Sequence, residues 1–489
     1  MYYSIKFDQY KVMSFKNLYN QNKLYFLSFF SIFLCAIFSV GFFHPDEHYQ
    51  LLEFANYKLG NIEVRQLPWE FHEKIRPTLQ PIIAFVTIKI LNLISITSPF
   101  LIAFFLRLIS SILSFYCLHK IFHFYSNEFK SEYLKKWFYL FTFFSWFLLF
   151  IGVRFSSENW SACIFTIGLI HFLSTKEEVT RKYLILGLFL GLAFLIRFQT
   201  AFFILGLSFW LLIVNQTKFK NCLLLIVSFS FVVLLGILLD SWFYNSITIT
   251  PFNYFYQNIV LNKAANFGVE PWWYYFKIAF EKGIPPISII FILATIYFFI
   301  KNPKNPLTWI SVPFILIHFM IGHKELRFLF PLFFFLPYFF IQTIDYLVQK
   351  NQVELHSKSK PAKWLRFLFV FNLIFYIIII FRPMTTKVYL FDFLYNRSKN
   401  EKLIYFTDNN PFETIDFYKR NQLTIKKMDV NVDSNFITNN RGKLIITIPE
   451  KRDLFKKQKL IFQTYPDWLQ LFNIGNWMGK SEQYFIYKI

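Results

Sequence analysis

Long apolar runs alternate with short polar segments along most of the chain. They lie at residues 24–43, 137–153, 160–174, 183–196, 199–215, 222–239, 285–300, 307–321, 328–345 and 364–381, with two more inside 79–119. Most of them approach the roughly 20 residues that an α-helix needs to cross the hydrocarbon core of a bilayer. The pattern predicts an all-α polytopic membrane protein with about 11 or 12 transmembrane or re-entrant helices.

The distribution of charge suggests an orientation for these helices. Acidic residues gather in 44–78 and basic residues in 120–136, and cytoplasmic loops carry an excess of Lys and Arg. We therefore expect 44–78 and 240–284 to be external loops and 120–136 to be cytoplasmic. Because 79–119 must then make one net crossing, one of its two runs is expected to be a short or re-entrant helix packed inside the protein. Otherwise the orientation rule fails at 120–136.

The chain changes character after residue 382. Residues 383–489 are polar, with short β-like runs such as 444–448. We expect 1–382 to form a transmembrane module and 383–489 a small extracytoplasmic soluble α/β domain.

Composition excludes an ordinary soluble enzyme. The chain is 55% hydrophobic and 16% charged, whereas soluble domains carry about 25% charged residues. Its 51 Lys and Arg against 29 Asp and Glu give a net charge of +22, but no basic stretch lies within a nucleic-acid motif. We interpret the excess as cytoplasmic loops facing a lipid bilayer and expect no nucleic-acid partner. The four cysteines have no paired spacing, so no disulfide framework or metal site is predicted.

The sharpest polar feature is the acid pair Asp46-Glu47, directly after the first apolar run. A carboxylate fixed beside the membrane can take a proton from an acceptor hydroxyl, as a general base does. A solvated pair of loop acids is an equally good interpretation of the spacing alone. A divalent-cation site is a further possibility, but no other suitably spaced acid supports it.

Further charged residues lie at the edges of apolar runs on the same predicted outer face. Charged groups beside membrane spans are costly and often bind phosphate or a charged substrate. The candidates are Arg154, Arg197, His323, Lys324 and Arg327. For a single residue, snorkelling of a long side chain toward the head groups is the simpler explanation. It does not explain the alternating signs of 323–327.

An aromatic cluster, 271–275, contains Trp272 and Tyr275. It could stack on sugar rings, although Trp and Tyr are also enriched at membrane interfaces. The interfacial interpretation is favoured from the sequence alone.

Five motifs between residues 44 and 331 together resemble glycosyltransferase family 22, the Alg9-like and GPI-type mannosyltransferases of the GT-C superfamily. The motifs are His44-Pro45-Asp46-Glu47 with Gln50; Trp69-Glu70 with Arg76-Pro77 and Pro81; 154–158; 240–244 with 251–258 and 268–275; and 323–328 with Pro331. Two positions depart from the family pattern: Glu270 stands where the family has His, and Ser157 or Glu158 where it has Asn. The Phe-rich and Lys-rich composition suggests a bacterial member.

The resemblance implies a GT-C fold and an inverting transfer of a hexose, most simply mannose. The donor would be a polyprenyl-phosphate sugar and the acceptor a glycan or glycolipid, on the outer face of a bacterial inner membrane or of an endoplasmic reticulum membrane. Asp46 would be the base and Glu47 would orient the acceptor, and the implied chemistry needs no metal or other cofactor. The implied donor-phosphate ligands are His323, Lys324, Arg327, Arg154 and Arg197. The implied substrate contacts are His44, Gln50, Trp69, Glu70, Arg76, Asp240, Glu270, Trp272 and Tyr275.

Two other functions stay open. A transferase of the same class could use another sugar, such as arabinose. A transporter or flippase of lipid-linked sugars would place ionisable residues near the midplane and show matching halves. The sequence shows neither, because its charges lie at the ends of the runs and no internal repeat is visible.

Overall fold

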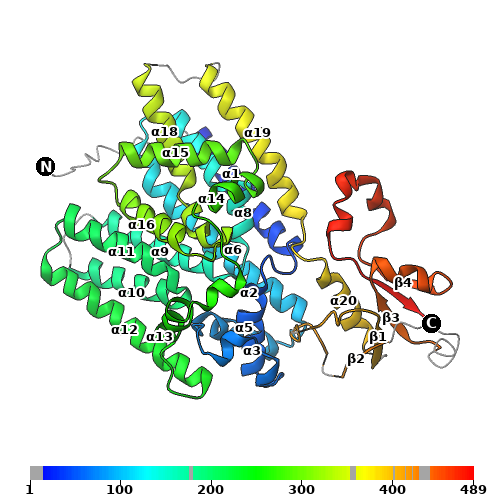
Figure 1. The fold of residues 1–489 in the computed structure, drawn as a ribbon. Coiled ribbons are helices and arrows are strands. Elements are labelled where there is room, and N and C mark those ends of the chain that lie inside the picture. Colours follow the sequence, from blue (N-terminus) through cyan, green and yellow to red (C-terminus); the bar gives the residue numbers. More distant parts are fainter. Residues whose placement is uncertain are drawn as a thin grey trace.

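The computed structural model describes residues 15–175, 180–352, 359–399, 402–413, 415–420, 422–428 and 441–489. A large helical body carries a small sheet domain at one side (Figure 1). The long helices of the body are α1 (Phe15–Phe38), α5 (Leu79–Leu93), α6 (Pro99–Tyr125), α7 (Glu132–Phe143), α8 (Trp146–Gly152), α9 (Ser157–Ser174), α10 (Thr180–Ile196), α11 (Ala201–Phe209), α12 (Phe219–Tyr244), α15 (Ile287–Lys301), α16 (Pro306–Met320), α18 (Leu336–Lys350) and α19 (Lys360–Phe381).

Each predicted apolar run contains or overlaps a helix, which confirms the predicted fold class. In the described part of the chain, α12, α19 and α6 with its following turn are long and apolar enough to cross a membrane. Two bent pairs raise that number to as many as five: α7 with α8 at 44°, and Leu326–Phe333 with α18 at 59°. Residues 79–119 form a 15-residue helix, α5, and the first part of the 27-residue α6.

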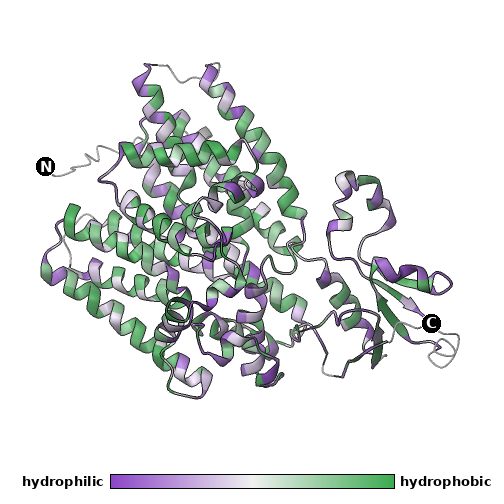
Figure 2. Ribbon diagram, viewed as in Figure 1, coloured by the Kyte–Doolittle hydropathy of each residue, from purple (hydrophilic) through white to green (hydrophobic). Residues whose placement is uncertain are grey.

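Hydrophobic residues cover the helical body, whereas hydrophilic residues gather on the connecting segments and on the small domain (Figure 2). Helices α10 and α12 lie against each other through small residues. A methyl group added at Gly187 would collide with Ser228, and one at Gly191 would lie 2.7 Å from the Cβ atom of Val232. Small residues at such an interface allow the close backbone approach by which membrane helices pack.

The two predicted external loops are largely helical. The first contains α2 (Pro45–His48), α3 (Phe54–Lys58) and α4 (Trp69–His72), and the second contains α13 (Thr250–Phe255) and α14 (Tyr274–Lys282). Helix α12 continues to Tyr244, past residue 240, where the second loop was expected to begin. Asp240 therefore lies on the last turns of a helix, where its carboxylate accepts hydrogen bonds from the backbone N and the Oγ1 of Thr78, at 2.8 and 2.6 Å.

The C-terminal region forms the predicted small α/β domain. Its strands are β1 (Leu403–Phe406), β2 (Thr424–Lys427), β3 (Leu444–Thr447), β4 (Lys459–Gln463) and β5 (Phe485–Lys488), in the order β2-β1-β3-β5-β4. The β2-β1-β3 part is parallel, and β5 is antiparallel to both β3 and β4. Helix α20 (Lys387–Arg397) and the sheet share one hydrophobic cluster with α5 and α6, so the domain packs directly on the helical body.

Candidate active site

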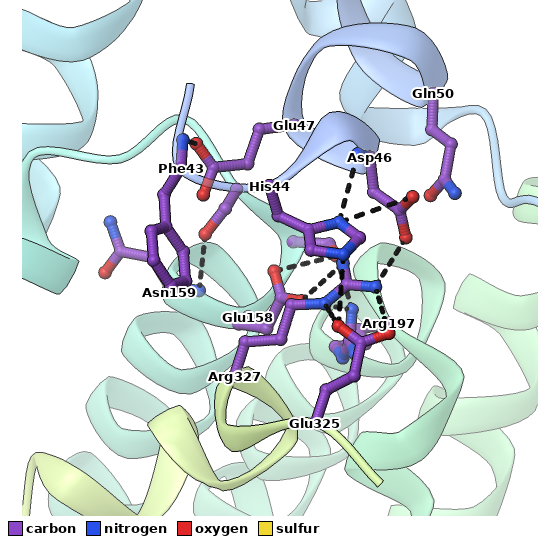
Figure 3. A network of polar contacts seen from close by, with 12 residues as sticks. Phe43, His44, Asp46, Glu47, Gln50, Glu158, Asn159, Arg197, Glu325 and Arg327 are labelled. Carbon is purple, nitrogen blue, oxygen red and sulfur yellow. Dashed lines mark hydrogen bonds and ion pairs between the residues drawn. The ribbon is translucent and has the colours of Figure 1, made fainter. Parts of the chain in front are cut away.

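The acid pair lies on a short helix directly after the first long helix. Pro45 is the first residue of α2, and its fixed φ suits that position. Successive residues of a helix are about 100° apart around its axis, so Asp46 and Glu47 point in different directions (Figure 3). The two carboxylates therefore meet different sets of cations.

Asp46 is held by cations from three segments. Its Oδ2 lies 2.8 Å from Nη2 of Arg327 and 3.7 Å from Nη2 of Arg76, and its Oδ1 lies 3.5 Å from Nδ1 of His44. Burial alone would raise the pKa of Asp46, but the charge of Arg327, the hydrogen bond from His44 and the charge of Arg76 outweigh it. The pKa of Asp46 is held well below its usual range, and this carboxylate is ionised at neutral pH.

Glu325 forms the opposite side of the same cluster. It accepts from Nε2 of His44 at 3.1 Å, from Nε2 of His323 at 2.9 Å and from Nη2 of Arg327 at 3.1 Å. Burial opposes ionisation, yet these hydrogen bonds hold the pKa of Glu325 well below its usual range. Burial likewise disfavours a charged His44, but its bonds to Asp46 and Glu325 raise its pKa to about 9.

Glu158 extends the network to a second arginine. Its Oε1 lies 2.9 Å from Nη1 of Arg197 and 3.3 Å from Nη1 of Arg327, and Arg197 also donates to Oγ of Ser157 at 2.8 Å. A chain of alternating charges therefore runs from Asp46 through Arg327 and Glu158 to Arg197 (Figure 3).

Glu47 points away from this series of alternating charges. One of its oxygens accepts from the backbone N of Phe43 at 3.0 Å and lies 3.7 Å from Nη1 of Arg154. Arg154 also donates to Oγ of Ser39 at 2.6 Å. Burial raises the pKa of Glu47, and the charge of Arg154 opposes that shift only in part. The two acids of the pair are thus electrostatically unlike.

Asp46 lines a cavity with an empty volume of about 510 Å³ that is open to solvent. Gln50 and Arg76 share its wall and both contact Glu70, at 3.3 and 3.6 Å. The lining comprises Asp46, Glu47, Gln50, Leu51, Arg76, Pro77, Gln80, Ser156, Ser157, Glu158, Ile196, Arg197, Phe198, Gln199 and Tyr254. A wall of carboxylates, guanidiniums and amides suits a polar ligand such as a sugar.

Several predicted site residues do not line this cavity. Nζ of Lys324 donates to two backbone carbonyl oxygens, that of Glu270 at 2.9 Å and that of Ile321. Nδ1 of His323 donates to the carbonyl oxygen of Gly268 at 3.1 Å, while its other nitrogen faces Glu325. These contacts tie 323–327 to the end of the second loop.

The aromatic residues predicted to contact a substrate also lie away from this cavity. Trp69 stacks on Phe267 with ring centroids 6.0 Å apart, and Tyr275 stacks on Phe319 at 5.7 Å. Trp272 is 64% exposed. None of the three aromatic residues proposed as sugar contacts lines the cavity that contains Asp46.

Sequence reasoning did not single out Glu158, Glu325 or Gln80 as site residues. Glu158 and Glu325 lie inside two of the recognised motifs, so each motif contained the signal. Gln80 is a polar residue at the start of an apolar helix; it is 1% exposed, and neither atom of its amide group has a hydrogen-bond partner. Among the described residues, no group of three or more His, Cys, Asp or Glu side chains could hold a metal ion.

Residues 24–420 match the sequence pattern of the Alg9-like mannosyltransferase family. The chain belongs to this family. The match confirms the family resemblance drawn from the five motifs.

Curated relatives include GPI mannosyltransferase 3 of Drosophila melanogaster, 27% identical over 318 residues, which are 63% of this chain and 54% of that protein. GPI alpha-1,2-mannosyltransferase 3 of Homo sapiens is 26% identical over 337 residues, 68% of this chain and 57% of that protein. The aligned region thus spans little more than half the length of these relatives.

Among solved structures, ArnT from Cupriavidus metallidurans bound to undecaprenyl phosphate has a similar fold. The TM-score is 0.57 at 10% sequence identity, over 96% of this chain and 98% of that one. The likeness confirms a GT-C membrane fold, including the small C-terminal domain.

Proposed function

We propose that the protein transfers a mannosyl residue from a polyprenyl-phosphate donor to a hydroxyl of a glycan or glycolipid on the extracytoplasmic side of the membrane. The family supports the sugar, because the relatives are named as mannosyltransferases. The solved structure with undecaprenyl phosphate supports a lipid-phosphate donor. The single observation that carries the proposal is an ionised Asp46 in the wall of a polar cavity next to a membrane helix.

Asp46 acts as the general base in this proposal. The acceptor oxygen attacks the anomeric carbon, the bond from that carbon to the phosphate oxygen breaks, and the hydroxyl proton passes to Asp46. One displacement converts a β-linked donor into an α-glycoside and releases the polyprenyl phosphate. A base works best when its pKa lies near the working pH, whereas Arg327 and its neighbours keep that of Asp46 low in the free protein.

Arg327 can explain how Asp46 has a low pKa in the free protein and still acts as a base when the donor is bound. Its guanidinium has five N–H groups and contacts Asp46, Glu158 and Glu325 at once. A donor phosphate competing for Arg327 would weaken its pull on Asp46 and raise the pKa of that base when the substrate is present. Arg197 and Arg327 would then stabilise the growing charge on the leaving phosphate.

The remaining predicted residues have supporting roles in this proposal. His44 and His323 hold Glu325 beside Arg327, and Lys324 holds the 323–327 segment through backbone carbonyls. Gln50 and Arg76 form part of the cavity wall with Asp46, and Glu70 contacts both of them from behind the wall. They are the candidates for contact with the acceptor.

A direct test offers purified protein three synthetic donors: polyprenyl-phosphate mannose, polyprenyl-phosphate arabinose and GDP-mannose. Membrane glycolipids extracted from the native source serve as acceptors, and Arg65→Gln, at an exposed ion pair with Glu63, is the control variant. We expect transfer from polyprenyl-phosphate mannose only. Transfer from polyprenyl-phosphate arabinose and not from the mannose donor would show that the transferred sugar is arabinose. Transfer from GDP-mannose, or no transfer from any of the three donors, would reject the proposal.

The side of the membrane has its own test. Arg65 and Glu132 are both exposed and lie on segments predicted to face opposite sides. Single cysteines at the two positions, in a chain whose native cysteines are replaced, are treated with a membrane-impermeant maleimide on intact cells. The proposal predicts labelling of Arg65→Cys and protection of Glu132→Cys; the reverse pattern would place the site in the cytoplasm.

A further inference from the structure

A second cavity lies on the other side of Glu47 from the cavity that Asp46 lines, which is called the catalytic cavity below. It has an empty volume of about 400 Å³, and Glu47 belongs to the walls of both cavities. Its wall brings together the segment after α1, the N-terminal third of α6, the turn before α9 and the C-terminal region. The polar and aromatic residues of this wall are Glu47, His48, Arg107, Arg154, Phe155 and Tyr418.

Three nitrogen-bearing side chains in this wall are almost fully buried: His48 is 1% exposed, Arg154 3% and Arg107 7%. Arg107 interrupts the apolar sequence of α6. Its Nε donates to the carbonyl oxygen of Ala36 at 2.9 Å, and no carboxylate in the described part of the chain lies within ion-pair distance of it. A buried arginine inside a membrane helix is costly unless something compensates its charge.

The other two side chains also keep unused donor or acceptor capacity. Among the described residues, Arg154 has one carboxylate partner, Glu47 at 3.7 Å, and its buried Nε has no hydrogen-bond partner. His48 uses Nε2 to contact Glu53 at 2.7 Å, whereas its Nδ1 is buried without a partner. The wall therefore holds two guanidiniums and one carboxylate, Glu47, which contacts only Arg154 of the two, so the wall carries an excess of positive charge.

The C-terminal domain closes this cavity. The ring of Tyr418 stacks on that of His48 with centroids 5.5 Å apart, and the backbone N of Phe417 donates to Glu53 at 2.9 Å. The same Glu53 oxygen contacts His48, so the domain fixes the orientation of that imidazole. A hydrogen bond of this kind behind a side chain holds it in one orientation for binding a ligand.

We propose that His48, Arg107 and Arg154 form a binding site for the phosphate group of a lipid phosphate. Arginine matches the geometry of phosphate oxygens with parallel N–H bonds, and the anion would supply the charge that this wall lacks. The exposed apolar side chains of Ile37, Phe38 and Leu101, on the adjoining ends of α1 and α6, offer a surface for the hydrocarbon chain. Because Glu47 separates the two cavities, the bound phosphate lies beside the catalytic cavity. The choice of lipid rests on the proposed function.

The test measures binding to the full-length protein in nanodiscs by native mass spectrometry, without any transfer reaction. The probes are undecaprenyl phosphate, undecaprenol and inorganic phosphate, and the variants are Arg107→Gln, Arg107→Lys and the exposed control Arg65→Gln. We expect undecaprenyl phosphate to bind wild type and Arg65→Gln at least about tenfold more tightly than undecaprenol. Arg107→Gln should lose about tenfold of this affinity, and Arg107→Lys a smaller part because an ammonium cannot form two parallel bonds.

Unchanged affinity in both Arg107 variants would overturn the proposal, as would equal binding of undecaprenol and undecaprenyl phosphate by wild type. Inorganic phosphate that binds as tightly as the lipid would reject the lipid as the source of the phosphate. If Arg107→Gln does not fold, Arg107→Lys decides between these outcomes. A protein that binds undecaprenyl phosphate through Arg107 but transfers no sugar would reject the proposed function and leave this site standing.

Discussion

Arg327 and Asp46 are 281 residues apart in the chain, yet their side chains meet with Nη2 and Oδ2 at 2.8 Å. The contact joins the first polar loop to the segment between α16 and α18. Glu158 contacts the same guanidinium at 3.3 Å. Three of the recognised motifs therefore meet at one arginine, which explains why they occur together in one chain.

The pKa of His44 predicts how stability depends on pH. Its pKa is raised from near 6.5 to about 9 in the folded protein. Its contribution to stability is therefore fully present below about pH 6.5 and is lost as the pH rises through about 9. Thermal unfolding in detergent should show wild type more stable than His44→Gln at pH 6, with a difference that shrinks toward pH 9.5. A difference that grows with pH would contradict the contacts assigned to His44.

Glu158→Gln should destabilise the fold strongly. The change leaves Arg197 buried with only Ser157 as a neutral partner and removes one of the carboxylates around Arg327. Removing one member of a buried ion pair costs about 3 to 5 kcal/mol. The free energy of unfolding, followed by tryptophan fluorescence, should fall by that amount. The matched control Glu132→Gln, at an exposed pair with Lys135, should change it by no more than about 0.5 kcal/mol.

The Gln80→Leu variant should show whether Gln80 contributes to substrate binding or to the stability of the fold. The buried amide of Gln80 has no protein partner and faces the cavity wall. Replacing it with an apolar group should therefore leave the free energy of unfolding unchanged or raise it. If the amide binds a sugar hydroxyl, KM should rise by about tenfold. A lower stability with an unchanged KM would show that Gln80 is structural.

Transfer should continue in EDTA. Arg197 lines the cavity and Arg327 contacts Asp46 in its wall, and in the proposal both stabilise the single phosphate of a lipid donor, so the chemistry has cationic groups of its own. The rate with synthetic donor should be the same in 5 mM EDTA as in buffer, where that concentration is about a thousandfold above trace metal. A loss of activity that added Mg²⁺ or Mn²⁺ restores would show that a cation takes part.

Much of the fold was predictable because helix length and apolarity dominate in a membrane. The polar core of the site was predictable in part. The predicted helix orientation placed Asp46, Arg197 and Arg327 on one face, and the structure brings them into one network. Which charged side chains pair with one another was not predictable, because pairing depends on rotamers and on the crossing angles between helices that are distant in the chain. The pairing of Glu158 with two arginines, and the importance of Arg107, are therefore recognised only in three dimensions.

The same limit applies to residues that the motifs overstated. Trp69 and Tyr275 occupy motif positions but stack on other aromatic rings, and Lys324 satisfies backbone carbonyls. A residue can match a motif because it shapes a loop, without lining the cavity. Contacts in the folded chain are needed to separate residues that shape a loop from residues that line a cavity.

The most direct test of the account compares wild type with Asp46→Asn in transfer from polyprenyl-phosphate mannose to a membrane glycolipid. The amide keeps the size of the side chain but cannot take the hydroxyl proton, so kcat should fall by about 10²- to 10⁴-fold. Donor should bind at least as tightly as to wild type, because Arg327 no longer has to leave a charged Asp46. Glu63→Gln, an exposed acid of the same loop, is the control and should keep wild-type kcat. An Asp46→Asn protein that is folded, binds donor and transfers mannose at the wild-type rate would contradict the central claim.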